Sequence, residues 1–191
     1  SADLKGENCL YTRTHFEKPD KKVRELILLN LSDGSETLLG EGFSPIFSPK
    51  GGKVLFSKKV EGLPQLFLLD LESKTARQLT DMRFGAESAR FSPDGERICF
   101  LSRVELDTDP SLWAKSLTEE EKKAETLRKV KHPYVSFSDY GYKSDEDGGF
   151  SVNRAWTLWS MKTTDSTPTL LSDGVRDHVM PVFTPDGEKI L

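Results

Sequence analysis

The chain has 191 residues and a formal net charge of −4, with 36% hydrophobic and 30% charged residues. Basic and acidic residues are interspersed, so the sequence lacks the clustered positive charge of nucleic-acid-binding domains. Its longest apolar runs have the length of a strand, far short of the about 20 residues that cross a membrane as a helix. We therefore expect neither nucleic acid nor membrane among its partners.

A short phrase recurs along the chain, at residues 47–56, 91–100 and 183–191, with a weaker copy at residues 3–11. Each of the three clear copies places an apolar residue before a proline, a glycine and a second apolar run. Proline presets φ for a turn, glycine supplies the positive φ that closes a short hairpin loop, and the flanking residues prefer strands. Each copy therefore predicts a hairpin that joins two strands.

Two further apolar segments follow each hairpin and predict two more strands per unit. The first of them lies at residues 26–29, 66–69 and 158–161, and the second near residues 38–39, 78–79 and 170–171. Gly6 and Gly51 are 45 residues apart, and Gly51 and Gly95 are 44 apart. Four short strands in roughly 40 to 50 residues are typical of a β-propeller blade. The predicted fold is all-β, a partial β-propeller of four-stranded antiparallel blades.

The repeats predict one incomplete propeller domain over residues 1–191, with about three blades and the start of another. We expect blades at about 1–42, 43–86 and 87–176 and a further start at 177–191. Closure of a propeller removes exposed strand edges, and here the first strand before Asp3 and the end of the last unit are absent from the pattern. The chain is therefore expected to be a fragment of a larger protein.

The third unit is longer than the others and predicts an insertion at about 104–150, with a degenerate extra blade as the alternative. Gly95 and Leu158 are 63 residues apart, whereas Gly51 and Leu66 are only 15 apart. Within the insertion, residues 118–131 predict a short surface helix, because Thr118 can act as its N-cap and Glu121 can complete a capping box.

The repeats resemble those of a known family. The Phe-Ser-Pro-Asp-Gly phrase at 91–95, together with Leu-Phe-Leu-Leu-Asp-Leu at 66–71 and Arg-Gln-Leu-Thr at 77–80, is similar to TolB-like (PD40) propellers and to the N-terminal propeller of the prolyl oligopeptidase (S9) family. The loop at 140–150, followed by Leu-Trp at 158–159 and Pro-Asp-Gly at 185–187, resembles the acylaminoacyl-peptidase branch. Lys50 in place of aspartate and an extra acidic residue within 144–149 depart from that pattern.

The resemblance implies that a C-terminal α/β-hydrolase domain of the same parent protein carries a Ser-His-Asp triad. The propeller would cap that active site and restrict entry to short peptides, so the hydrolase domain and short peptides are the implied partners. The fragment itself is expected to be inactive. The alternative is a TolB-like scaffold that binds a protein partner and has no attached enzyme, because the propeller fold alone does not define a function.

The sequence predicts no catalytic, cofactor-binding or metal-binding residue. A nucleophile elbow requires Gly-x-Ser-x-Gly, and the segment around Ser44 lacks the last glycine. The three histidines are scattered: His15 is expected in a polar connection, His132 in the insertion and His178 beside Asp177. The acidic run at 145–148 does not fit an EF-hand loop, because the first and last positions would be cations.

Three groups of residues have a structural and a functional interpretation. Glu119, Glu120 and Glu121 resemble a clamp for a peptide amino group, but helix capping explains them better. Cys9 and Cys99 are expected to be buried free thiols rather than a disulfide, which favours the cytoplasm. The segment from 113 to 159 is rich in aromatic residues. Among these, Trp159 is expected in the core, Trp156 in the core or between blades, and Tyr134, Tyr140 and Tyr142 against the hydrolase domain.

Overall fold

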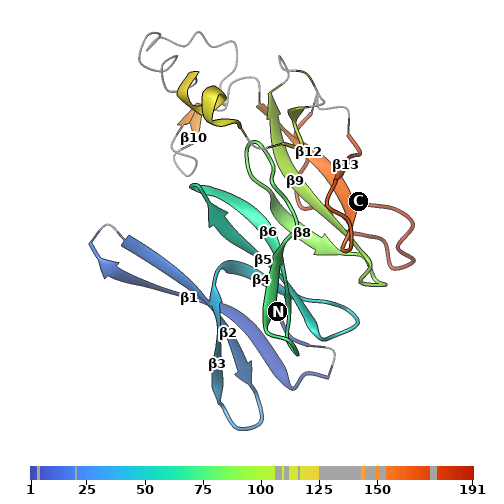
Figure 1. Cartoon of the computed structure of the whole chain (residues 1–191). Coiled ribbons are helices and arrows are strands. Elements are labelled where there is room, and N and C mark those ends of the chain that lie inside the picture. The colour runs from blue at the N-terminus through green and yellow to red at the C-terminus, as the bar shows by residue number, and fades with distance from the viewer. Residues whose placement is uncertain are drawn as a thin grey trace.

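In the computed structural model, the described part of the chain consists mostly of antiparallel strands that form separate sheets (Figure 1). It describes residues 1–3, 5–19, 21–105, 109, 112–115, 117–124, 143–144, 149–150, 154–172 and 176–191. Three main sheets follow one another in chain order, as successive propeller blades do (Figure 1). The predicted all-β partial propeller is confirmed.

The first sheet has the order β1-β2-β3, with β1 at Asn8–Lys18, β2 at Lys21–Asn30 and β3 at Glu36–Glu41. Residues before β1 occupy the place of a first strand: Ala2 bridges to Cys9, and the Leu10 N–H donates to the Ser1 carbonyl at 2.6 Å. The first sheet therefore has three strands and one isolated bridge rather than a full first strand, as the repeat pattern predicts. The prediction that His15 lies in a polar connection was wrong, because β1 continues through this residue and pairs it with Val23.

The second sheet has the predicted four strands in the order β4-β5-β6-β7. Their bounds are β4 Phe43–Phe47, β5 Lys53–Val60, β6 Leu63–Asp70 and β7 Thr75–Gln78. The hairpin between β4 and β5 is the one that the first clear copy of the repeated phrase predicts, and its glycines Gly51 and Gly52 have φ values of 74° and 68°. The proline–glycine phrase thus forms the hairpin at its predicted place.

The third sheet has the order β8-β9-β12-β13, with β8 at Glu87–Phe91, β9 at Arg97–Glu105, β12 at Arg154–Lys162 and β13 at Thr169–Leu170. Phe100 lies opposite Trp159 in this sheet, as Phe56 lies opposite Phe67 in the second. Because β9 pairs directly with β12, residues 106–153 connect the second and third strands of one sheet. That connection is the arrangement that an insertion requires.

The described part of this connection includes a helical turn at residues 119–124 and two short paired strands, β10 (Lys143–Ser144) and β11 (Gly149–Phe150). The predicted capping box is confirmed: the Glu121 N–H donates to Thr118 Oγ1 at 3.3 Å, and the Thr118 N–H donates to Glu121 Oε2 at 2.7 Å. The rest of the predicted helix, residues 125–131, lies outside the described residues.

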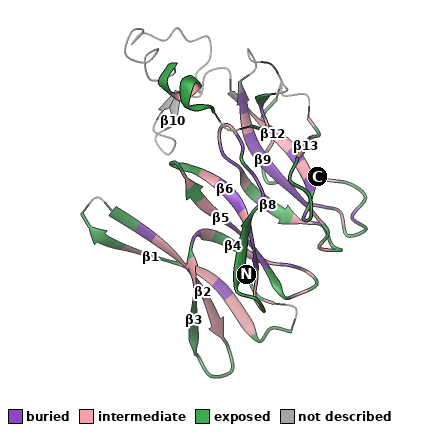
Figure 2. Cartoon of the chain, viewed as in Figure 1, coloured by how far each residue is buried: buried purple, intermediate pink, exposed green. Residues whose placement is uncertain are grey.

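Two clusters of buried side chains hold the three sheets together. One cluster joins the first and second sheets through Leu10, Leu26 and Phe56. The other joins the second and third sheets around Phe100 and Trp159, which are 0% and 3% exposed. Figure 2 shows that buried residues concentrate on the middle strands β5, β6, β9 and β12. The predicted place of Trp159 in the core is confirmed.

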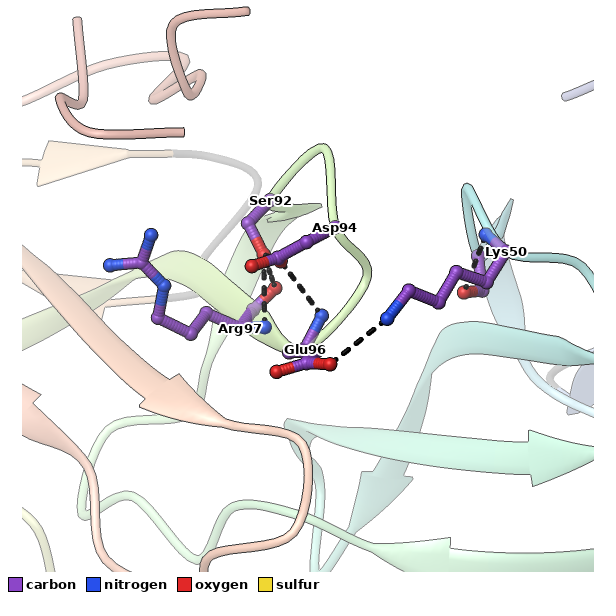
Figure 3. A network of polar contacts seen from close by, with 6 residues as sticks. Lys50, Ser92, Asp94, Glu96 and Arg97 are labelled. Carbon is purple, nitrogen blue, oxygen red and sulfur yellow. Dashed lines mark hydrogen bonds and ion pairs between the residues drawn. The ribbon is translucent and has the colours of Figure 1, made fainter. Parts of the chain in front are cut away.

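Polar contacts close the hairpin at residues 92–97 and connect it to the preceding hairpin (Figure 3). The Arg97 N–H donates to Ser92 Oγ at 2.9 Å, and the Glu96 N–H donates to Asp94 Oδ1 at 3.0 Å. The Ser92 hydroxyl also donates to Asp94, and this bond, with that of Glu96, holds the pKa of Asp94 below its usual value. Lys50 Nζ lies 2.9 Å from Glu96 Oε1, so the lysine that departs from the repeat pattern links two hairpins.

The core between the second and third sheets predicts a large effect for Phe100→Ala. Truncation of this fully buried ring should lower the free energy of unfolding by about 3–5 kcal/mol, because it leaves a cavity between sheets. Urea unfolding measures it, with Phe16→Ala as the control, since Phe16 is 64% exposed and should change stability by less than about 0.5 kcal/mol. Equal effects of the two variants would contradict the assigned core.

Candidate functional site

The candidate site is a groove of ≈ 1080 Å³ between the first strands of the second and third sheets, β4 and β8. We call it the inner groove. Its walls also include the start of β2, the end of β5, the turn between β5 and β6, and single residues of β9 and β12. The groove therefore lies where all three sheets meet, and it collects residues that are far apart in the sequence.

Positive charge dominates the lining of the inner groove. Five of its side chains are basic and one, Glu87, is acidic; the basic ones are Lys22, Arg24, Lys59, Arg90 and Arg103. The chain as a whole carries a net charge of −4, so this is a local reversal of its overall charge. A concave surface with one sign of charge concentrates ligands of the opposite sign.

Aromatic rings orient two of the groove's arginines. The Arg24 guanidinium lies 4.8 Å from the centroid of the Phe43 ring, and that of Arg103 lies 4.5 Å from the Trp156 ring. A guanidinium over a ring face gains cation–π attraction while its N–H groups stay in its own plane, where they can bind a carboxylate. Trp156, which was expected in the core or between blades, is half-buried and lines the groove.

Backbone strain recurs at the groove at the period of the repeat. Ser44 and Ser88 both have a φ of 53°, and Met180, at the equivalent position of the last repeat, has a φ of 46°. Each lies three residues before the phenylalanine that opens the hairpin phrase. The strand register shifts at Ser44 and Ser88, so each marks a bulge in the first strand of its sheet. A strained non-glycine residue of this kind is costly and is often found at functional sites.

Ser44, whose surrounding sequence does not fit a nucleophile elbow, is one of these groove residues. It lies inside β4 rather than at a strand-to-helix turn. The two described histidines are engaged elsewhere. His15 Nδ1 is 3.8 Å from Glu25, and His178 Nδ1 is 2.9 Å from the Arg176 carbonyl and 3.2 Å from that of Trp156. Asp177 accepts a hydrogen bond from the Trp156 N–H at 2.8 Å, so it anchors the start of β12.

The glutamates at 119–121 do not line the inner groove. Glu119 lies 2.9 Å from Lys122, which also pairs with Glu61 on the turn between β5 and β6. Glu121 belongs to the capping box and lies 3.2 Å from Arg83, and these contacts hold its pKa below its usual value. The arrangement agrees with helix capping, and it ties this part of the insertion to the second sheet.

Other predicted residues divide between the core and segments outside the described residues. Both cysteines are free; the predicted burial is confirmed for Cys99, whereas Cys9 is half-buried. Burial raises the pKa of the Cys99 thiol to about 11, so it stays protonated and unreactive near neutral pH. Trp113 is 6% exposed in the core. His132, Tyr134, Phe137, Tyr140, Tyr142 and the run at 145–148 lie outside the described residues.

Within the described ranges, no group of three or more His, Cys, Asp or Glu side chains is placed to hold a metal ion. The same part of the chain contains no helix that is long and apolar enough to cross a membrane.

No family model matches the chain. Comparisons with individual known proteins support the assignment of the fold as a propeller. The chain is 30% identical over 146 residues to the uncharacterized peptidase YuxL of Bacillus subtilis. This match covers 75% of this chain and 20% of that peptidase. The chain thus spans about a fifth of the length of that relative.

A comparison with solved structures supports the same fold. The acylaminoacyl peptidase of Pyrococcus horikoshii superposes with a TM-score of 0.63 at 16% identity, over 90% of this chain and 24% of that one. TolB of Acinetobacter baumannii gives a TM-score of 0.59 at 16% identity, over 99% of this chain and 35% of that one. The chain is a partial β-propeller of the kind found in these proteins, and the predicted resemblance to acylaminoacyl-peptidase and TolB propellers is confirmed.

The strained serines of the inner groove give a test of its local geometry. Ser88→Val should lower the free energy of unfolding by about 1–3 kcal/mol, because a β-branched residue at positive φ is strongly disfavoured. Ser88→Asn should be nearly neutral, since asparagine tolerates this conformation. Thermal and urea unfolding compare the two variants, and a valine that is tolerated as well as asparagine would contradict the bulge.

Proposed function

We propose that this chain is the non-catalytic propeller portion of a serine peptidase of the acylaminoacyl-peptidase or oligopeptidase type. The observation that carries the proposal is the 30% identity to a peptidase over 75% of the chain. The propeller fold shared with an acylaminoacyl peptidase supports it. In this proposal the bond-breaking residues belong to an α/β-hydrolase domain of the same parent protein, which is the propeller's main partner.

The physical role that we propose is to cap the active site and select substrates by size. A groove of ≈ 1080 Å³ suits a few residues of an extended peptide. A folded domain of about 100 residues has a radius of gyration of about 13 Å and cannot enter such a space. Short unfolded peptides would therefore reach the active site, and folded proteins would be excluded. The two free cysteines favour a cytoplasmic location for this protein.

The alternative function is a TolB-like scaffold that binds a protein partner without an attached enzyme. The similarity to TolB over 99% of this chain favours it, since one propeller fold serves both kinds of protein.

The full-length protein that contains residues 1–191 distinguishes these functions. A chromogenic acyl-aminoacyl substrate should be hydrolysed by the full-length protein and not by residues 1–191 alone, and a fluorophosphonate probe should label a serine outside this range. Deletion of the propeller should raise the cleavage rate of a folded protein relative to that of a short peptide. A full-length protein that neither hydrolyses the substrate nor reacts with the probe would contradict the peptidase function and leave the scaffold.

A further inference from the structure

We propose that the inner groove is a binding site for peptides that carry carboxylates. The residues that carry this proposal all lie in this chain, so it can be tested independently of the proposed hydrolase domain. The proposal goes beyond size selection, because it assigns the groove a preference for the charge of its ligand.

The first argument is the segregation of charge. Three of the groove's basic residues come from different sheets: Arg24 from β2, Lys59 from β5 and Arg90 from β8. They meet in one groove of a chain whose net charge is −4. Nothing in the repeat requires basic residues there, since the position of Arg90 is occupied by Ile46 in the preceding blade and by Val182 in the following one. The basic lining is therefore a feature of this groove rather than of the repeat.

The second argument is that three of the groove's cations are accessible. Lys22, Lys59 and Arg90 are exposed, and Arg90 uses one nitrogen for the Ala89 carbonyl at 2.8 Å. By contrast, Lys50 and Arg83, which lie outside the groove, form ion pairs with glutamates. Arg24 is half-buried over the Phe43 ring, which fixes its guanidinium plane. Planar guanidinium groups bind carboxylates through two parallel hydrogen bonds.

The third argument concerns the rest of the lining, which fits a peptide. Apolar and aromatic side chains alternate with the cations; they include Phe43, Pro45, Ile46, Leu63, Pro64, Phe84 and Trp156. Ser44 and Ser88 add exposed hydroxyl groups on the two strands that flank the groove. Such a mixture can contact peptide side chains and backbone, while the net charge of −4 disfavours a long polyanion such as nucleic acid. The carboxylate can come from acidic side chains or from the C-terminus of the peptide.

Trp156 provides the readout, because it lines the groove while Trp113 and Trp159 are buried in the core. We would titrate residues 1–191 with an acetylated Ala-Glu-Ala-Glu peptide and follow tryptophan fluorescence, with calorimetry as a second measurement. The peptide with glutamine in place of glutamate tests the side-chain carboxylates, and the C-terminal amide tests the terminal carboxylate. At least one replacement should weaken binding by about tenfold or more, and added salt should weaken it further.

The variant Lys59→Gln/Arg90→Gln removes two exposed cations and should weaken binding of the acidic peptide by about tenfold or more. Lys162→Gln/Lys189→Gln removes two exposed cations outside the groove and is the matched control, which should bind normally. Arg24→Lys tests the bidentate geometry, because it keeps the charge and loses the planar fork. Thermal unfolding of each variant verifies that it is folded.

Three results would overturn the proposal. The acidic peptide and the peptide that lacks both kinds of carboxylate could bind equally. The groove variant could bind as tightly as the control variant. A single-stranded oligonucleotide could bind as tightly as the acidic peptide and displace it, in which case the groove would be a general polyanion site rather than a peptide site.

Discussion

The fold depends on the close stacking of two hairpins, those that contain Gly95 and Gly187, each on the hairpin before it. A Cβ atom added at Gly95 would lie 2.9 Å from Ser48 Oγ in the preceding hairpin, and one added at Gly187 would lie 3.4 Å from Pro93. Both glycines also have positive φ, so their lack of a side chain serves the turn and the stacking together. The ion pair of Lys50 with Glu96 and the hydrogen bond from Arg97 to the Gly187 carbonyl reinforce the same contacts.

The inner groove lies where the three sheets meet. Its lining residues come from all three sheets, and its basic residues are divided among them. The bulges at Ser44 and Ser88 repeat at the blade period and shape the two strands that flank the groove. Strain of order 1–3 kcal/mol at such positions persists only when the surrounding structure compensates for it, and here two buried clusters do so.

Most of the fold could be predicted because its determinants are local in the sequence. The proline–glycine phrases, the capping box of Thr118 and Glu121, and the core position of Trp159 each follow from residues within one repeat. The length of β1 could not be predicted, since its polar outer half, near His15, reads as a loop until its pairing with β2 is known. A strand that is polar on both faces lacks the alternation of apolar and polar residues, so the sequence does not indicate its register.

The inner groove could not be predicted, because it depends on how sheets are placed relative to one another. Lys22, Arg90 and Trp156 have no sequence relation that would bring them together. The strained serines left one signal, their separation of 44 residues, which equals the spacing of Gly51 and Gly95. The glutamates at 119–121, which do stand out in the sequence, serve the local structure instead.

Alanine substitutions at two equivalent glycines test the stacking of hairpins most directly. Gly51 and Gly95 occupy the same place in the repeated phrase and have φ values of 74° and 68°, but an added Cβ at Gly51 would meet no atom within 4 Å. Gly95→Ala should therefore lower the free energy of unfolding by at least about 1 kcal/mol more than Gly51→Ala. The difference is the cost of overpacking the tight contact at Gly95. Equal losses of stability in the two variants would contradict hairpin stacking as the basis of this fold.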